Sequence, residues 1–289
     1  MKTRTGDFPI GFRRTGGQWA RNLADLAAWA ASSGFEAIDV DKVTAEDMAA
    51  LRSAGLAVGT VDLRGRFTSP DAGERKAAVE AAGEFIRQQA ALGARIFFAV
   101  VAGDPARKRL ENYAAAVESF GQLAKIAGDC GGHIAIEGWP GGGNLPNLCC
   151  NPETCRAFIR DTDPRVVGIN YDPSHLIRMG IDHVRFLVEF APYVKHVHGK
   201  DTEIISEAVY EYGLYQPAVF APPHGFGEHV WRYTIPGHGQ ARWTQILRTL
   251  QQAGFAGIVS VELEDENFNG SEAGEKEGLL RSLEFLRGA

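Results

Sequence analysis

The chain has 289 residues, of which 45% are hydrophobic, and it carries a formal net charge of −6. This length suits one large domain such as a (β/α)₈ barrel of roughly 250 residues. An acidic chain without a basic cluster disfavours a nucleic-acid partner, and the absence of a long apolar run disfavours a membrane-embedded protein.

Short β-rich apolar runs alternate with amphipathic stretches along the whole chain. This alternation predicts parallel βα units in a single domain over residues 1–289. Most of the predicted helices close on a glycine, as the first does at Gly34. The expected strands are Pro9–Phe12, Ala37–Val40, Ala57–Asp62, Arg95–Val101, His133–Glu137, Val166–Asp172, Tyr193–His198 and Gly257–Glu262.

Helices are predicted between these strands and after the last of them. They are Asn22–Ser32, Ala45–Ser53, Ala72–Leu92, Arg107–Asp129, Pro152–Arg160, Asp182–Glu189, Arg242–Ala253 and Glu272–Arg287. A (β/α)₈ barrel closes with eight strands, the number predicted here. A dinucleotide-binding open sheet is disfavoured because no G-x-G-x-x-G motif follows the first strand. The sequence therefore predicts an α/β fold of the TIM-barrel type.

A segment of about forty residues, Lys200 to Gly239, separates the seventh strand from the helix that follows it. Connections in compact domains are usually about 4–6 residues long, so we expect this insert to be a lid, a binding loop or a subunit contact. The alternative is that the insert is an ordinary long loop that packs on its own barrel and has no separate role.

Ligand-type side chains end four consecutive predicted strands: Glu137, Asp172, His198 and Glu262. Catalytic residues of a (β/α)₈ barrel lie at the C-terminal ends of its strands, and the alternation of side chains along each strand directs these four inward. Three converging carboxylates would repel one another without a cation. We therefore predict one divalent metal ion, with Mn²⁺ preferred and Mg²⁺, Co²⁺ or Zn²⁺ as alternatives.

Several segments resemble the sugar phosphate isomerase/epimerase family of the xylose isomerase-like barrel superfamily. These are IAIEGWPGG, INYDPSHLIRMGID, VKHVHGKD, IPGHGQARW and GFAGIVSVELED, within about Arg95 to Leu263. The resemblance implies the same four metal ligands. It also implies that His175 and His238 contact substrate, with Arg232 as a further substrate-binding residue.

The resemblance implies a metal-dependent isomerase or epimerase acting on a sugar or keto-sugar. In that reaction Glu137 and Glu262 would exchange a proton next to the carbonyl, through an enediolate. An inosose dehydratase or a keto-glycoside lyase would use the same site for β-elimination.

Other classes of protein are less well supported. An endonuclease IV-like enzyme needs additional histidines at earlier strand ends, and a sugar-binding module does not need two metal-bound glutamates. The N-terminal sequence lacks the apolar stretch of a signal peptide, so we expect a cytoplasmic protein. The resemblance also allows a homo-oligomer.

Overall fold

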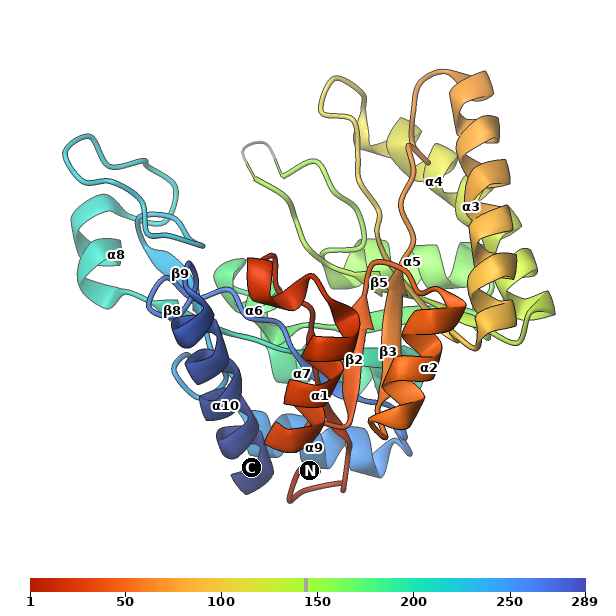
Figure 1. Cartoon of the computed structure of the whole chain (residues 1–289). Coiled ribbons are helices and arrows are strands. Elements are labelled where there is room, and N and C mark those ends of the chain that lie inside the picture. Colours follow the sequence, from red (N-terminus) through yellow and green to blue (C-terminus); the bar gives the residue numbers. More distant parts are fainter. Residues whose placement is uncertain (143–144) are drawn as a thin grey trace.

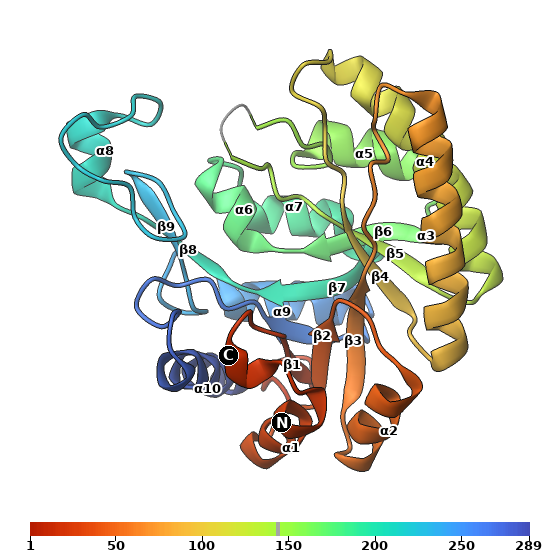
Figure 2. The ribbon, with the colours of Figure 1, turned by 45° about the horizontal axis from the view of Figure 1, so that its top comes forward.

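The structure is a computed structural model that describes residues 1–142 and 145–289. Eight parallel strands form a closed barrel in the order β1-β10-β7-β6-β5-β4-β3-β2, and helices surround it (Figures 1 and 2). The predicted TIM barrel is thus confirmed. Its strands are β1 (Ile10–Arg13), β2 (Ala37–Val40), β3 (Ala57–Asp62), β4 (Ile96–Val100), β5 (His133–Glu137), β6 (Val167–Tyr171), β7 (Val194–Gly199) and β10 (Val259–Val261).

The helices follow the predicted order, because the same apolar stripes that indicate them pack on the barrel. Several begin with a side chain that caps the first turn, and Thr44 and Asp47 form a complete capping box. They are α1 (Leu23–Ser33), α2 (Ala45–Ser53), α3 (Ala72–Leu92), α4 (Arg109–Asp129), α5 (Pro152–Asp161), α7 (His183–Phe190), α9 (Trp243–Gln252) and α10 (Glu272–Gly288), with short 3₁₀ turns at Gln18–Ala20 and Ala191–Tyr193.

One short helix, α6 (Pro173–Arg178), was not among the predicted elements. Asp172 is its N-cap and Pro173 occupies its first position. An Asp-Pro pair favours a helix start, because the carboxylate accepts a backbone N–H and proline fixes φ. The turn places His175 directly beside the end of β6.

The predicted insert contains regular structure of its own. Strand β8 (Asp201–Ile204) pairs in antiparallel fashion with β9 (Trp231–Thr234), and helix α8 (Ser206–Tyr212) follows β8. Residues 205–230, called the arm below, extend away from the barrel beside its open end (the cyan segment in Figures 1 and 2). Within the described residues, no helix combines the length and apolar character needed to cross a membrane.

Candidate metal and catalytic site

Three carboxylates converge at the C-terminal ends of the barrel strands. Glu137 ends β5, Asp172 follows β6 and Glu262 follows β10. Each of them, together with His175, offers one ligand atom within 4.8 Å of the others. The closed barrel therefore brings together side chains that are more than a hundred residues apart in the chain.

His198, on β7, lies between two of these carboxylates. Its Nδ1 is 2.6 Å from Glu137 Oε1 and 3.3 Å from Glu262 Oε2. The ring of Phe98 stacks on the imidazole at a centroid distance of 5.3 Å. Three of the four predicted ligands, Glu137, Asp172 and Glu262, thus share one group of possible ligand atoms with His175. The fourth, His198, contacts two of these carboxylates but shares a second group with Asp39 and His196.

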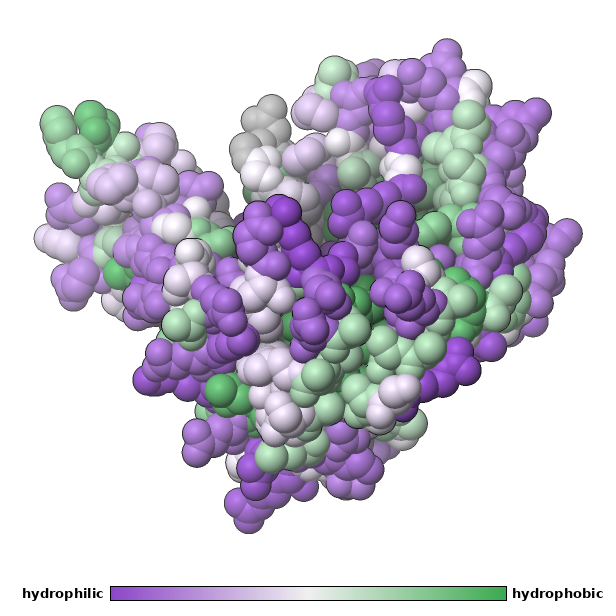
Figure 3. All heavy atoms as spheres, in the orientation of Figure 1, coloured by the Kyte–Doolittle hydropathy of each residue, from purple (hydrophilic) through white to green (hydrophobic). Residues whose placement is uncertain are grey.

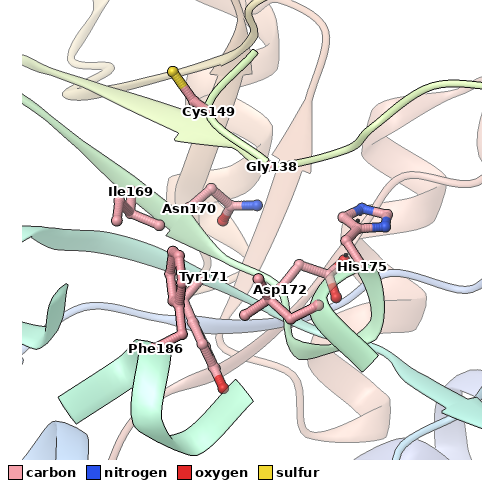
Figure 4. A pocket seen from close by; sticks show the side chains of 9 residues that line it. Gly138, Cys149, Ile169, Asn170, Tyr171, Asp172, His175 and Phe186 are labelled. Carbon is pink, nitrogen blue, oxygen red and sulfur yellow. Dashed lines mark ion pairs between the residues drawn. The ribbon is translucent and has the colours of Figure 1, made fainter. Parts of the chain in front are cut away.

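The start of α6 determines how Asp172 is presented. Its Oδ1 accepts the backbone N–H of Ser174 at 2.8 Å, which anchors the carboxylate. The other oxygen, Oδ2, is buried and has no hydrogen-bond partner among the described residues. Figure 4 shows Asp172 between Asn170 on β6 and His175 on α6. One capped oxygen therefore leaves the second available to a ligand.

Two basic side chains stabilise Glu262 in its charged form. Lys200 Nζ lies 2.5 Å from Glu262 Oε2, and Arg13 Nε lies 3.5 Å from Glu262 Oε1. Burial alone would raise the pKa of this carboxyl group, but Lys200 and His198 lower it well below its usual value. Glu262 is thus held as a carboxylate, the form that can accept a proton.

Lys200 is fully buried, and three carboxylates surround it. Its Nζ contacts Asp172 and Glu264 at 3.3 and 2.8 Å in addition to Glu262. Burial lowers the pKa of a lysine, yet these carboxylates raise that of Lys200 well above its usual value. The ammonium group therefore offsets part of the negative charge of the cluster.

The remaining negative charge acts on His198. Burial disfavours its charged form, but Glu262 and Glu137 raise the pKa of His198 well above the ordinary histidine value. Because a metal ion must bind the neutral ring, a proton and a cation compete for this position. Either one relieves the repulsion between the two glutamates.

The donor set fits a divalent cation. Asp172 Oδ2, His175 Nε2 and His198 Nδ1 are buried, and none has a hydrogen-bond partner in the described part of the chain. Carboxylate oxygens with one or two imidazole nitrogens are ligands for Mn²⁺, Mg²⁺, Co²⁺ or Zn²⁺. A buried polar atom without a hydrogen-bond partner is costly in a protein interior unless a ligand uses it.

A second polar group lies deeper in the barrel. Asp39 Oδ2, on β2, lies 2.9 Å from His196 Nε2 and 3.7 Å from His198 Nε2. Gly59 on β3 leaves room for it, because a Cβ at that position would lie 1.9 Å from Asp39 Oδ1. Asp39 thus faces the ring nitrogen of His198 that points away from the glutamates.

The structure does not bring Arg232 or His238 to this cluster. Arg232 pairs with Glu203 and Glu266 at 2.8 Å each. His238 is exposed, and its ring lies 6.5 Å from that of Phe268. Substrate contact by these two residues stays a prediction.

Tyr233, the neighbour of Arg232 on β9, lies against the cluster instead. Its hydroxyl oxygen is 2.7 Å from His175 Nδ1 and 2.9 Å from Arg178 Nη1. Adjacent residues of a strand point to opposite faces, so the choice between Arg232 and Tyr233 depends on how the hairpin folds back. The sequence shows that Arg232 and Tyr233 lie on opposite faces of the strand, but it does not show which face points toward the barrel.

The sequence matches a family model described as "Xylose isomerase-like TIM barrel" over residues 27–289. It is 33% identical over 193 residues to "Uncharacterized protein YfiH" of Bacillus subtilis, covering 65% of this chain and 57% of that protein. It is 26% identical over 152 residues to "Inosose dehydratase" of Geobacillus thermodenitrificans, covering 52% of this chain and 46% of that protein. The matches thus span about half the length of these relatives.

Solved structures share the fold at low sequence identity. The apo form of the 3-keto-D-glucoside 4-epimerase YcjR from E. coli superposes with a TM-score of 0.69 at 16% identity, covering 97% of this chain and 99% of that one. A D-psicose 3-epimerase crystallised with D-fructose gives 0.70 at 17% identity, covering 96% and 98%. At these identities the likeness concerns the architecture.

Proposed function

Because the chain belongs to the xylose isomerase-like TIM barrel family, we propose that it is a metal-dependent isomerase or epimerase of a sugar or keto-sugar. The supporting observation is that Glu137 and Glu262 both approach one atom, His198 Nδ1, at 2.6 and 3.3 Å. Two carboxylates around one position suit the removal and return of a proton at a single carbon.

Glu137, Asp172, His198 and Glu262 would hold the divalent ion. When bound, the ion would polarise the substrate carbonyl and make the adjacent C–H more acidic. One glutamate removes this proton to form an enediolate, and the other returns a proton from the opposite face. Lys200 and Arg13 keep Glu262 ionised and ready to accept.

The neighbours of Glu137 orient it in the same site. Asn170 Nδ2 donates to Glu137 Oε1 at 2.8 Å, which limits rotation of the carboxylate. His175 Nε2 lies 3.6 Å from Glu137 Oε2 and supplies a polar group for a substrate oxygen. Glu137 is buried and the side chain of Glu262 is 13% exposed, so bulk water has limited access to both, which strengthens these electrostatic contacts.

The experiment combines metal analysis with solvent exchange. We expect purified protein to bind a stoichiometric divalent ion and to incorporate deuterium from D₂O next to the carbonyl of a keto-sugar. Glu262→Gln should reduce this exchange by at least about 100-fold, since general acid–base groups contribute 10²- to 10⁴-fold.

Glu277→Gln provides the control, because Glu277 pairs with Arg281 on the exposed face of α10. It should retain exchange activity and stability. Unchanged exchange in Glu262→Gln would refute the proton-transfer role of this residue. A metal-free protein without exchange would favour a sugar-binding module instead.

A lyase is the second candidate, and the similarity to an inosose dehydratase favours it. The same proton abstraction would then be followed by loss of a β-hydroxyl group or, from a keto-glycoside, of the aglycone. Product analysis distinguishes the two outcomes: a dehydrated sugar or a free aglycone identifies the lyase, and an isomeric sugar identifies the isomerase or epimerase.

A further inference from the structure

We infer that Arg178 and Tyr233 fix His175 as the tautomer that carries its hydrogen on Nε2. This deepens the proposed function and rests on it, because it makes His175 a hydrogen-bond donor in the site and excludes it from the ligands of the metal. Arg178 and Tyr233 are then positioning residues. Nothing in the motif around His175 by itself determines this choice.

Three side chains form a hydrogen-bonded row that leads to the carboxylates. Arg178, at the end of α6, lies 2.9 Å from the Tyr233 hydroxyl, and this hydroxyl lies 2.7 Å from His175 Nδ1. Tyr233 is 4% exposed and His175 is 1% exposed, so bulk water has little access to either. Each hydrogen in the row therefore needs a protein partner.

Counting donors assigns the hydrogens. The guanidinium of Arg178 can only donate, so the Tyr233 oxygen accepts from it. Within residues 1–142 and 145–289, the remaining partner of the Tyr233 hydroxyl is His175 Nδ1. The phenolic hydrogen is satisfied only if it is donated to Nδ1. A neutral imidazole that accepts at Nδ1 carries its hydrogen at Nε2.

The opposite tautomer leaves one hydrogen of this row without a partner. With its hydrogen on Nδ1, the ring would donate to the Tyr233 oxygen, and the buried phenolic hydrogen would stay unsatisfied, at a cost comparable to a lost hydrogen bond. His175 Nε2, which lies 3.4 Å from Asp172 Oδ2 and 3.6 Å from Glu137 Oε2, has no hydrogen-bond partner among the described residues and is open to a ligand.

Arg178 is itself held in place by neutral groups. Its Nη2 donates to the carbonyl of Gly141 at 2.7 Å, and its guanidinium lies 4.6 Å from the centre of the Trp231 ring. No carboxylate lies within ion-pair distance of it among the described residues. The guanidinium can therefore direct its donors to the Tyr233 oxygen without a competing anion.

This row gives the β8–β9 hairpin a role in the site. Tyr233 is the residue through which the insert reaches His175, and Lys200 Nζ lies 4.5 Å from the centre of its ring. The Nε2–H of His175 is then available to a substrate oxygen near the glutamates. The hairpin thereby positions a substrate contact that belongs to the barrel.

The test reads the tautomer directly in metal-free protein. Long-range ¹H–¹⁵N spectra at pH 8 distinguish Nδ1–H from Nε2–H rings, and comparison with His175→Gln assigns the signal of His175 among the eight histidines. We expect an Nε2–H ring in the wild-type protein. An Nδ1–H ring or a doubly protonated ring would overturn the inference, whether or not any variant folds.

Variants then test the row itself. Tyr233→Phe and Arg178→Met should give a mixture of tautomers at His175, and Arg178→Lys should restore the Nε2–H form. Tyr113→Phe is the control, because the Tyr113 hydroxyl bonds to Asp161 away from the site and its loss should leave the spectrum of His175 unchanged. An unchanged tautomer in both Tyr233→Phe and Arg178→Met would refute the role of these residues.

In the loaded enzyme, Tyr233→Phe should lower kcat/KM by about 10-fold, at the lower end of the effect of groups that orient site residues. This measurement depends on the proposed reaction, whereas the spectrum does not. If the protein lacks the activity but His175 shows the Nε2–H form and responds to the variants, the proposed function fails and this inference stands.

Discussion

Asp39 is a single buried side chain that contacts the proposed metal site, and with His196 and His198 it offers ligand atoms that lie within 4.8 Å of one another. It is completely buried, accepts a hydrogen bond from His196, and faces His198 Nε2 at 3.7 Å. Histidine ligands usually donate their second ring N–H to a carboxylate or carbonyl group, which fixes the tautomer that leaves the other nitrogen free. For His198 this free nitrogen would be Nδ1, the atom nearest the two glutamates.

Replacing Asp39 with Asn should therefore weaken metal binding while preserving the shape of the interior. We expect the dissociation constant for Mn²⁺, measured by isothermal titration calorimetry, to rise by about 10- to 100-fold. The physical reason is the loss of the charged acceptor that faces His198 Nε2.

Ser119→Ala is a suitable comparison for Asp39→Asn. Ser119 is equally buried and donates to the Phe67 carbonyl at 2.8 Å, outside the site. Its replacement should cost stability without changing the affinity for Mn²⁺. Equal affinities in Asp39→Asn and the wild-type protein would show that Asp39 only fills space.

At the scale of elements, the arm differs from the rest of the chain in its packing. No residue of α8 is buried. Large apolar side chains of the arm are exposed instead, with Tyr215 at 93% and Phe220 at 100%. Figure 3 shows this hydrophobic tip on the side of the molecule where the arm extends. This tip of the arm, around Tyr215 and Phe220, therefore contributes little to the stability of the barrel.

We expect the double variant Tyr215→Ser, Phe220→Ser to unfold in urea with a free energy within about 0.5 kcal/mol of the wild-type value, as is usual for exposed substitutions. The substitutions remove side chains that have no packing to lose. A destabilisation of several kcal/mol would mean that the tip is covered in solution, and sedimentation of the wild-type protein would then identify a self-association.

The β8–β9 hairpin at the base of the arm behaves differently from the tip. Tyr233 and Thr234 are buried, and Asp201 accepts the backbone N–H groups of Gly237 and Ala241. These contacts anchor the hairpin to the barrel end. The insert thus consists of a fixed base beside the site and an exposed tip.

At the scale of the whole molecule, the site joins strands from the middle and the C-terminal part of the chain. Four neighbouring strands of one closed barrel carry the predicted ligands at their C-terminal ends: Glu137, Asp172, His198 and Glu262. Unfolding separates all of them, so an ion that binds only the folded cluster stabilises the entire domain.

Addition of Mn²⁺ at 100 times its dissociation constant should raise the free energy of unfolding by about 2.7 kcal/mol, and excess chelator should reverse the gain. Urea denaturation monitored by circular dichroism measures both. Glu262→Gln should show a much smaller gain because it lacks one ligand. An identical gain in that variant would place the ion elsewhere.

The sequence by itself determined the barrel and proposed most of the candidate site. Alternating apolar runs and helical stripes are local patterns, and the closure of eight strands follows from their number and order. The strand ends identified Glu137, Asp172, His198 and Glu262 because the period of two along each strand predicts which side chains point inward. Metal ligation by these four remains a prediction.

Only the tertiary structure decided which distant groups meet that cluster. Asp39 reaches the histidines because β2 and β7 face each other across a closed interior, and Gly59 leaves the space. Tyr233, and not Arg232, contacts His175 because the hairpin folds back with that face toward the barrel. Such contacts depend on the relative placement of separate elements, and no local pattern in the chain encodes that placement.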